Sequence, residues 1–304
     1  MASLRVGKGI RVAPRNALVA DVTSPEQRGA AYGLRQSLDT IGAAIGPLIA
    51  VALMSVSRQN FRLVFWLATI PGIIAVLLLI FGIKERDSNE TCHCGGNLRW
   101  LPHSTHKNPQ NPLQWQNWQN LDRGYWILLV VVVIFNLGNS SDAFLLLRSQ
   151  QVGINNTFIP LAFMVMNFTY FLSAYPAGAI SDRLGRYGLI TAGFMLYALI
   201  YCGFAYAETS WEIWILFAGY GLYQGMSKGV LLAAIGDRVP TELRGTAFGT
   251  IALATGIVLF PANFMAGWLW ENVSYQAPFL FGSVLSILAA LLLLLEVKMR
   301  PCNL

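Results

Sequence analysis

The amino-acid sequence predicts an all-α membrane protein, on the strength of its composition and its hydropathy pattern. Of its 304 residues, 55% are hydrophobic and 12% are charged, whereas soluble domains carry roughly 25% charged residues. A transmembrane helix needs about 20 mostly apolar residues to cross the hydrocarbon core. Eight runs meet that requirement, at about 30–55, 62–83, 124–147, 157–180, 187–207, 211–235, 246–269 and 276–296. This pattern does not fit an ordinary soluble enzyme.

The first 22 residues form a different segment, because cations interrupt an otherwise helical pattern. Arg5, Lys8, Arg11 and Arg15 recur at spacings of three and four and therefore share one face of a helix. Cations against lipid are costly, so this face must meet protein or water. It either lines a central cavity and attracts an anionic solute, or lies among lipid headgroups as a basic segment. We predict a partial helix here, in addition to the eight complete spans.

The connections between the apolar runs differ in charge, and this difference predicts the orientation of the chain. Cytoplasmic connections carry an excess of Lys and Arg. One side holds most of them: Arg28, Lys84, Arg86, Arg99, Lys107, Arg123, Arg183, Arg186, Arg238, Arg244, Lys298 and Arg300. The other side holds Arg58, Arg62 and Arg148. We therefore expect a multi-pass protein of the plasma membrane with a cytoplasmic C-terminus, and no nucleic-acid partner.

The long polar stretch at 86–123 is expected to be a cytoplasmic linker. It separates a segment at 1–85, with two complete spans, from a segment at 124–304, with six. Polar residues and prolines replace periodic apolar residues in this stretch, which is typical of a connection between two parts of a chain.

The linker also contains Cys92-His93-Cys94, followed by His103 and His106. Two thiolates and two imidazoles can form a tetrahedral zinc site. The C-x-C spacing is shorter than the usual C-x2-C, however, and we predict neither a metal nor a cofactor. The sequence also lacks G-x4-G-K-[ST], H-E-x-x-H and a Ser–His–Asp arrangement. We therefore do not expect an enzyme, and an ion or solute gradient is the expected energy source.

An internal repeat relates two parts of the sequence at a shift of 216 residues, without a gap. The matched pairs are Gly9 and Gly225, Ala17 and Ala233, Asp21 and Asp237, Glu26 and Glu242, Arg28 and Arg244, Gly29 and Gly245, Ala31 and Ala247, Tyr32 and Phe248, and Gly33 and Gly249. Parallel repeats are typical of transporters in which two helical halves enclose a solute site near the bilayer midplane. By this register the counterpart of residue 124 would lie about 92 residues before Met1, so we expect an incomplete first half.

Three sequence motifs resemble those of the major facilitator superfamily. Residues 178–186, Gly-Ala-Ile-Ser-Asp-Arg-Leu-Gly-Arg, resemble its loop motif G-x-x-x-D-R-x-G-R. The set Gly33, Gly42, Gly46 and Pro47 resembles the G-x8-G-x3-G-P motif of its antiporters, although Ala50 and Val51 replace the trailing Gly pair. Residues 5–9 are similar to its R-x-x-Q-G element, with Lys in place of Gln. The resemblance implies a helical bundle of that type and transport by alternating access.

The resemblance also implies a contact between Asp182 and the start of the helix near Arg28 and Gly29. A carboxylate suits the positive end of a helix, and such a contact would act as a latch that closes the cytoplasmic side. The alternative is a solvated loop that only sets orientation. We group the gating candidates as follows: Asp182, Arg183, Gly178, Gly185, Arg186, Arg28, Arg35, Asp39, Gly42, Gly46 and Pro47.

Two of these sets have their own alternatives. Arg35 and Asp39 are four residues apart and are expected to pair on one helix face, either as a gate or as a structural pair. Gly42, Gly46 and Pro47 permit close packing and bending. They serve either the antiport motion or helix packing alone.

Polar residues inside the predicted spans are the candidates for binding a substrate or a proton. Asn136, Asn139 and Asp142 lie in one apolar run, and Asn139 and Asp142 are three apart and can share a helix face. A desolvated carboxyl group can bind a proton near neutral pH. The alternative is that Asp142 caps its helix at the outer interface or pairs with Arg148.

Three cationic or amide residues complete the binding candidates. Lys228 lies one helical turn after Gln224, in the middle of a predicted span, and either binds an anionic group or extends to an interface. Arg5 corresponds to the arginine of the family's R-x-x-Q-G element. In the family, that arginine is associated with substrate or proton handling.

We therefore predict secondary active transport of a small solute across the lipid bilayer, and we favour proton-coupled efflux. One alternative is the uptake or exchange of an organic anion, which the Arg and Lys stripe suggests. Another is a non-transporting, truncated remnant of a transporter or a fragment with a misassigned start.

Overall fold

The computed structural model describes residues 2–56, 69, 73, 77, 121–155 and 158–298. The chain divides into two compact units, Met1–Gly42 with Pro112–Leu304, and Ala43–Asn111. Of the second unit, the described part is mainly the last turns of one helix, at residues 43–56. The account below therefore concerns the first unit.

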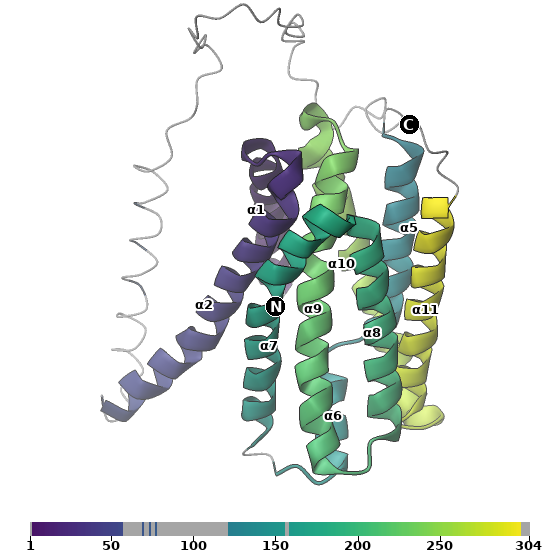
Figure 1. The fold of residues 1–304 in the computed structure, drawn as a ribbon. Coiled ribbons are helices and arrows are strands. Elements are labelled where there is room, and N and C mark those ends of the chain that lie inside the picture. The colour runs from purple at the N-terminus through teal and green to yellow at the C-terminus, as the bar shows by residue number, and fades with distance from the viewer. Residues whose placement is uncertain are drawn as a thin grey trace, which may run out of the picture. The chain divides into compact units, whose positions relative to one another are not determined.

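The described residues form helices and no strands (Figure 1), as the sequence predicts. The α-helices are α1 (Ala2–Val22), α2 (Arg28–Val56), α5 (Arg123–Gly138), α6 (Ala143–Gln151), α7 (Ile159–Leu184), α8 (Arg186–Tyr206), α9 (Ser210–Arg238), α10 (Arg244–Asn272) and α11 (Ala277–Lys298). Two short 3-10 turns, η1 (Pro25–Gln27) and η3 (Thr241–Leu243), precede α2 and α10. The cationic segment at the start of the chain is thus helical.

Seven of the eight predicted spans fall on described helices, and the eighth, at 62–83, lies outside the described residues. Within the described part of the chain, four stretches are long and apolar enough to cross a membrane: Arg123–Gln151, Arg186–Tyr206, Thr241–Asn272 and Ala277–Glu296. The long helices α7 and α9 are not among these stretches, and they carry much of the candidate site.

The run at 124–147 is not one helix, which corrects the sequence prediction. The first helix, α5, ends at Gly138, and α6 begins at Ala143. Gly138 lies so close to α11 that an added Cβ would be 3.1 Å from the Cα atom of Gly282. The Asn-Ser-Ser sequence that follows offers side chains that compete with helical backbone bonds. Irregular backbone at membrane depth requires burial or contact with water, so this break is a candidate functional feature.

Glycines on α9 allow it to pack closely on α7. A Cβ on Gly221 would lie 2.2 Å from the carbonyl oxygen of Met166, and one on Gly225 would lie 2.1 Å from Ser173 Oγ. Small residues are the usual means by which membrane helices approach one another, because lipid provides no hydrophobic driving force. These two helices therefore form a closely packed pair.

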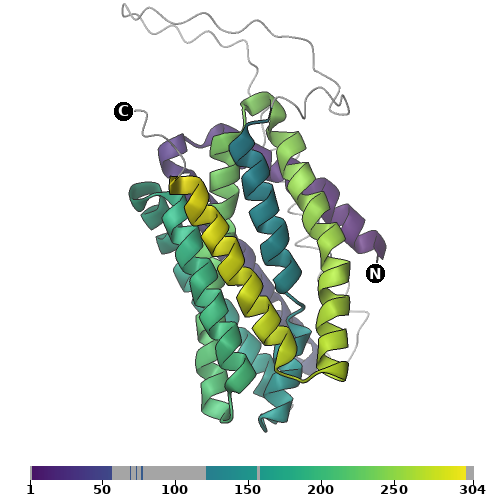
Figure 2. The ribbon, with the colours of Figure 1, turned by 90° about the vertical axis from the view of Figure 1, so that its right-hand side faces the viewer.

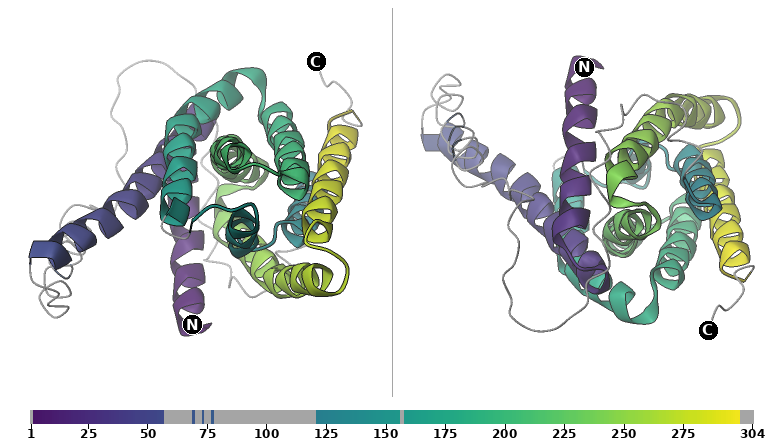
Figure 3. Two further views of the ribbon diagram at one scale, coloured as in Figure 1. Left: turned by 90° about the horizontal axis from the view of Figure 1, so that it is seen from below. Right: turned by 90° about the horizontal axis from the view of Figure 1, so that it is seen from above.

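The remaining helices of this unit pack around that pair. Seen along the helix axes, α8 lies between α9 and α11 (Figure 3), and α11 crosses α5 (Figure 2). The helix α10 contacts α1 on one side and α5 on the other. The first helix is thus held by helices from the far end of the sequence.

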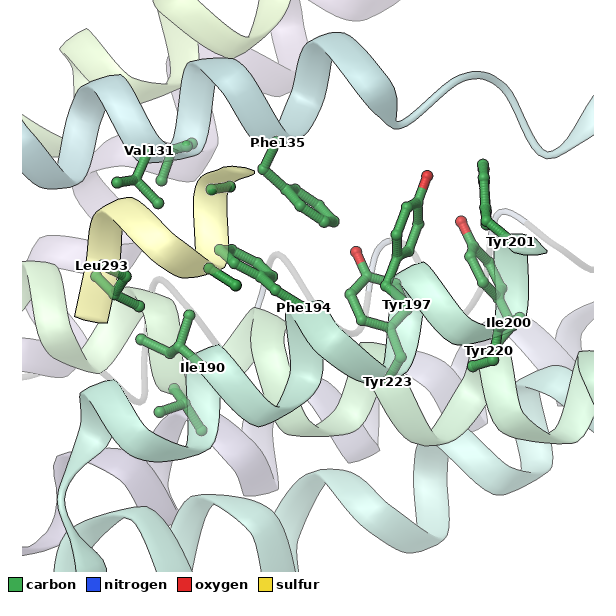
Figure 4. Close-up of a cluster of buried hydrophobic side chains, with 14 of the residues drawn as sticks. Val131, Phe135, Ile190, Phe194, Tyr197, Ile200, Tyr201, Tyr220, Tyr223 and Leu293 are labelled. Atoms are coloured by element: carbon green, nitrogen blue, oxygen red, sulfur yellow. The ribbon is translucent and has the colours of Figure 1, made fainter. Parts of the chain in front are cut away.

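Aromatic side chains fill the interior between α5, α8 and α9 (Figure 4). The rings of Phe135 and Phe194 stack at 4.2 Å, and those of Tyr197 and Tyr201 stack at 4.0 Å. Tyr220 and Tyr223 of α9 join the same cluster. Such pairs add about 0.5–1.5 kcal/mol each beyond the area they bury. The cluster lies beside the break between α5 and α6.

The start of α9 is fixed by an acidic side chain. Glu212 Oε2 accepts backbone N–H bonds from Thr209 at 3.1 Å and from Glu208 at 2.9 Å. The arrangement satisfies N–H groups that the end of a helix leaves without partners.

Arg148 of α6 is buried and does not pair with Asp142, contrary to one alternative considered above. Its guanidinium donates to the carbonyl oxygens of Phe204 at 3.0 Å and Ala207 at 2.7 Å, and lies 4.2 Å from the ring centre of Tyr275. Among the described residues no carboxylate pairs with it. The carbonyls at the end of α8 carry the negative end of the helix dipole and stabilise this cation.

We predict that Arg148→Met destabilises the protein. Two buried carbonyl groups would lose charge-assisted hydrogen bonds, which costs about 3 kcal/mol. For a protein of this size, that corresponds to a fall in Tm of about 6–12 °C. Thermal unfolding in detergent, followed by tryptophan fluorescence, measures the change. The exposed Arg123→Met is the matched control, and an equal Tm for both variants would contradict the assigned role of Arg148.

Candidate functional site

The carboxylate of Asp182 lies at the first turn of α2. Its Oδ1 accepts the N–H of Gly29 at 2.9 Å, and its Oδ2 accepts the N–H of Ala30 at 2.9 Å. The side chain is only 7% exposed. These two N–H groups have no partner within their own helix, and the helix dipole favours a negative charge there. This contact joins the end of α7 to the start of α2, at the position that the motif resemblance implied.

Glycines permit this contact because the two helices touch through their backbones. A Cβ on Gly178 would lie 2.1 Å from the carbonyl oxygen of Gly29, and one on Gly33 would lie 2.3 Å from that of Ala174. Gly185 ends α7 with a φ of +96°, a conformation that residues with a Cβ rarely adopt. We call the contact of Asp182 with Gly29 and Ala30, together with the Gly178–Gly29 approach, the Asp182 latch.

Two arginines flank the Asp182 latch and share one further carboxylate, Asp237 at the end of α9. Arg186 Nη2 lies 3.3 Å from Asp182 Oδ1 and donates to the carbonyl oxygen of Pro25 at 2.6 Å, while its Nε pairs with Asp237. Arg28 Nη1 donates to Asp237 Oδ1 at 2.8 Å. We refer to residues 21–28, 182–186 and 237–244 as the charged end of the bundle.

A second ion pair at the charged end is the repeat counterpart of the Arg28–Asp237 pair, with arginine and aspartate exchanged between the two repeats. Arg244 pairs with Asp21, and in the 216-residue register Arg244 corresponds to Arg28 and Asp21 to Asp237. Each repeat therefore gives an arginine to the other and receives one from it, as happens across a twofold axis. The rings of Tyr32 and Phe248, which are also repeat partners, lie 6.4 Å apart. This reciprocity supports the internal repeat as a structural relation.

The repeat is not complete in the described residues. Gly245 and Gly249, the counterparts of Gly29 and Gly33, have no neighbour within 4 Å of an added Cβ. Arg183, a predicted gating residue, is exposed at the end of α7 and takes part in none of the ion pairs of the described region. Among the described residues, the Asp182 latch is therefore present at the start of α2, and the start of α10 shows no corresponding close approach.

The predicted pair of Arg35 and Asp39 is present and has an additional member. Asp39 Oδ2 lies 3.6 Å from Arg35 Nη2 and 3.1 Å from Arg15 Nη2. Arg35 Nη1 also donates to Asn16 Oδ1. The stripe on the first helix thus meets α2 through Arg15, a contact that the spacing of the cations could not locate.

The other predicted residues on these helices are less fully described. Gly42 faces open space, with no atom within 4 Å of an added Cβ. Gly46 and Pro47 continue α2, and Arg5 belongs to α1, but their side chains lie outside the described part of the chain. The bend expected at Pro47 therefore stays a prediction.

Asp142 and Asn139 lie together, but not on one helix face as predicted. Both belong to the break between α5 and α6, and a tyrosine of α9 joins them. The hydroxyl of Tyr220 donates to Asp142 Oδ1 at 3.0 Å and lies 3.5 Å from Asn139 Oδ1. The side chain of Asp142 makes no capping bond to α6. Asn136 donates to the carbonyl oxygen of Val132 in its own helix, so it stands apart from this group.

Lys228 and Gln224 of α9 are in contact, as their spacing predicts. Lys228 Nζ donates to Gln224 Oε1 at 2.7 Å and lies 5.3 Å from the ring centre of Tyr170 on α7. Gln224 is one turn nearer the middle of α9, so the ammonium group turns away from the closer end of the helix. Whether Lys228 binds an anionic group or extends to an interface stays a prediction.

Tyr220, Gln224 and Lys228 follow one another at intervals of four residues, so they form a polar stripe on α9. Sequence reasoning missed Tyr220, although its spacing from Gln224 was a usable signal. It also missed Tyr170, for which no local signal existed. We call these three α9 residues the α9 stripe.

The zinc alternative rests on residues 92–106, which lie outside the described residues. Elsewhere in the described part of the chain, no group of three or more His, Cys, Asp or Glu is placed to hold a metal ion. The candidate site therefore consists of the charged end, the Arg15–Arg35–Asp39 group, the α9 stripe and the break at 139–142.

Comparison with known proteins agrees with this arrangement. An uncharacterized MFS-type transporter of Methanocaldococcus jannaschii is 29% identical over 297 residues, which cover 95% of this chain and 69% of the relative. The class C tetracycline resistance protein of Escherichia coli is 35% identical over 124 residues, 40% of this chain and 30% of that protein. The crystal structure of the human organic anion transporter MFSD10 superposes with a TM-score of 0.70 at 16% identity, covering 93% of this chain and 67% of that one.

The chain spans about two thirds or less of the length of these proteins. The helical bundle, the internal repeat and the Asp182 latch define it as a multi-pass membrane protein of a transporter class. The family model of the Major Facilitator Superfamily matches residues 2–148 and 126–301. The chain belongs to the Major Facilitator Superfamily.

We predict that Gly178→Ala opens the charged end. The added methyl group would meet the backbone of Gly29, so α2 and α7 must separate and Asp182 must lose its N–H partners. With Ala30→Cys in a background free of native cysteines, the rate of maleimide labelling should rise about tenfold, equivalent to about 1.4 kcal/mol. Gly188→Ala, where an added Cβ meets nothing within 4 Å, is the control. Unchanged labelling in Gly178→Ala would show that the close approach does not hold the contact.

Proposed function

We propose that the protein is a secondary active transporter that moves a small solute across the membrane by alternating access. The observation that carries this proposal is the Asp182 latch with its reciprocal ion pairs. These contacts are polar and few, and water can replace each of them when the helices separate. A charge-assisted hydrogen bond contributes only about 1.5–3 kcal/mol. The closed and open states can therefore differ by an energy that solute or proton binding can supply.

The orientation of the chain is part of the proposal. Arg28, Arg186, Arg238 and Arg244 gather at the charged end, whereas Arg148 lies near the opposite end, beyond the break. An excess of arginine supports a cytoplasmic position for the charged end, a cytoplasmic C-terminus and insertion in the plasma membrane.

The division into halves is also proposed. Residues 1–85 would belong to the first half, 86–123 to a cytoplasmic linker, and 124–304 to the second half. The reciprocal pairs Arg28–Asp237 and Arg244–Asp21 support this division, because they join elements that the repeat relates. The solute would bind between the halves, as in other parallel-repeat transporters.

Asp142 is the proposed proton site. It is an acidic residue on irregular backbone beside a cluster of tyrosines, and Tyr220 holds its carboxylate toward α9. Among the described residues it forms no ion pair, so its charge can change without the loss of a salt bridge. Asn139 shares the same tyrosine and would contribute a polar contact to the solute.

Outward transport coupled to protons is the favoured direction. The antiporter-like set of Gly33, Gly42, Gly46 and Pro47 supports it, as does the local similarity to the tetracycline resistance protein. Uptake or exchange of an organic anion is the second candidate, and the cation of Lys228 favours it. Flux measurements decide between these functions and a non-transporting remnant.

The test uses inside-out vesicles from cells that express the protein, with a pH gradient imposed across the membrane. Tetracycline and naphthalene-2-sulfonate serve as probe solutes, and a pH-sensitive dye reports proton movement. A transporter should give solute-dependent proton flux that vesicles without the protein lack. The absence of flux with a wider solute panel would favour the remnant.

We predict that Asp182→Asn lowers the maximal transport rate about tenfold or more. An amide has one acceptor oxygen, so one of the two N–H groups at the start of α2 would lose its partner, and the dipole would lose its counter-charge. Initial rates of solute movement in the vesicles measure the effect. Glu271→Gln removes an exposed carboxylate outside the charged end and should leave the rate unchanged. A normal rate in Asp182→Asn would remove the latch from the transport cycle.

We also predict that Asp142→Asn abolishes the dependence of transport on the pH gradient while solute exchange persists. The amide cannot take up and release a proton in the physiological range, although it keeps the shape of the side chain. Exchange of labelled solute and net uphill movement are measured in parallel. Glu271→Gln, an exposed carboxylate at the end of α10, is the control. Full uphill transport by Asp142→Asn would exclude Asp142 as the proton carrier.

A further inference from the structure

Lys228 is a cation near the middle of a long helix of the membrane bundle. It follows the first residue of α9 by 18 positions and precedes the last by 10. At a rise of about 1.5 Å per residue, these positions lie roughly 27 Å and 15 Å from the two ends. A charge at that depth is costly and marks a functional position by default.

The contacts of Lys228 hold the ammonium group without neutralising it. Gln224 accepts one of its three N–H donors, and the ring of Tyr170 offers its negative face at 5.3 Å. Within the described part of the chain, no carboxylate forms an ion pair with it. The residue as a whole is exposed, while its hydrogen bond to Gln224 is partly buried. A ligand can therefore reach a cation whose orientation is already fixed.

A second excess of positive charge lies on α1 and α2, and α2 packs on the helix that carries Tyr170, because Ser37 donates to the carbonyl oxygen of Phe171 at 3.0 Å. Arg15 and Arg35 share the single carboxylate of Asp39, so this group keeps one uncompensated positive charge. The Nε atoms of both arginines are buried and have no hydrogen-bond partner. Arg35 and Asp39 lie within electrostatic reach of Tyr170, whose ring faces Lys228. Tyr170 is thus near two cationic groups, one on α9 and one on α1 and α2.

We propose that Lys228 and the Arg15–Arg35 pair, together with the Tyr170 ring, bind the anionic group of an aromatic or amphipathic solute. A carboxylate, sulfonate or phosphate would supply the missing negative charge, and an apolar body would pack against the Tyr170 ring. This inference rests on the proposed transport function and names its substrate class as organic anions. It also assigns Tyr170 as a residue that positions Lys228.

The test measures binding to the purified full chain in detergent, without transport. Naphthalene-2-sulfonate and the neutral naphthalene-2-sulfonamide differ mainly in charge, and isothermal titration compares them. We expect the sulfonate to bind about tenfold more tightly or better. Lys228→Gln should remove that preference, whereas Lys228→Arg should keep it within a few-fold. Lys298→Gln removes an exposed lysine at the end of α11 and should change nothing.

Tyr170 and Arg35 provide independent variants. Tyr170→Leu removes the aromatic face and should weaken sulfonate binding about tenfold, while Tyr170→Phe should not. Arg35→Gln tests the second cationic group in a variant that leaves Lys228 intact, and should also lower the preference for the sulfonate. Benzoate and inorganic phosphate, measured in parallel, distinguish the acidic group from the apolar body. An unchanged Tm for each variant shows that it is folded.

The outcomes separate this inference from the proposed function. Equal affinity for sulfonate and sulfonamide, or undiminished sulfonate affinity in folded Lys228→Gln, would overturn the anion site even where vesicles show transport. Charge-selective binding that depends on Lys228, in a protein without measurable flux, would support the anion site and count against transport.

Discussion

The carboxylate of Asp182 at the start of α2 is the interaction on which the charged end depends. It satisfies two N–H groups that the helix cannot pair by itself, and it places a negative charge at the positive end of the dipole. Gly178 and Gly29 bring the backbones close enough for this contact. Because Arg186 binds both Asp182 and Asp237, the end of α9 is tied to the same point.

Two kinds of contact hold the described unit together. The close approach of α7 and α9 through Gly221 and Gly225 leaves no room for adjustment, and buried aromatic rings join α5, α8 and α9. At the charged end, ion pairs and single hydrogen bonds accompany an equally close approach of α2 and α7 at Gly29 and Gly178. Under the proposed function, opening would break these polar contacts and separate the two glycines.

The α9 stripe connects the break at 139–142 with the cations around Tyr170. Tyr220 faces Asp142 at one end of the stripe, and Lys228 faces Tyr170 at the other, with Gln224 between them. A proton site and an anion site would thus lie on one helix, two turns apart. Asp237 lies in the last turn of α9, so the stripe and the charged end belong to one helix.

The sequence by itself determined most of the helices, the internal repeat, the Arg35–Asp39 pair and, through the loop motif, the partner of Asp182. Periodicity, four-residue spacing and repeat register are local properties, so residues that share a helix face can be read directly. Only the tertiary structure decided that α5 breaks after Gly138, that Asp142 meets Tyr220, and that Arg148 binds the carbonyls of α8. Those contacts depend on which apolar helices pack together, and helices of similar hydrophobicity carry no local signal that selects their neighbours.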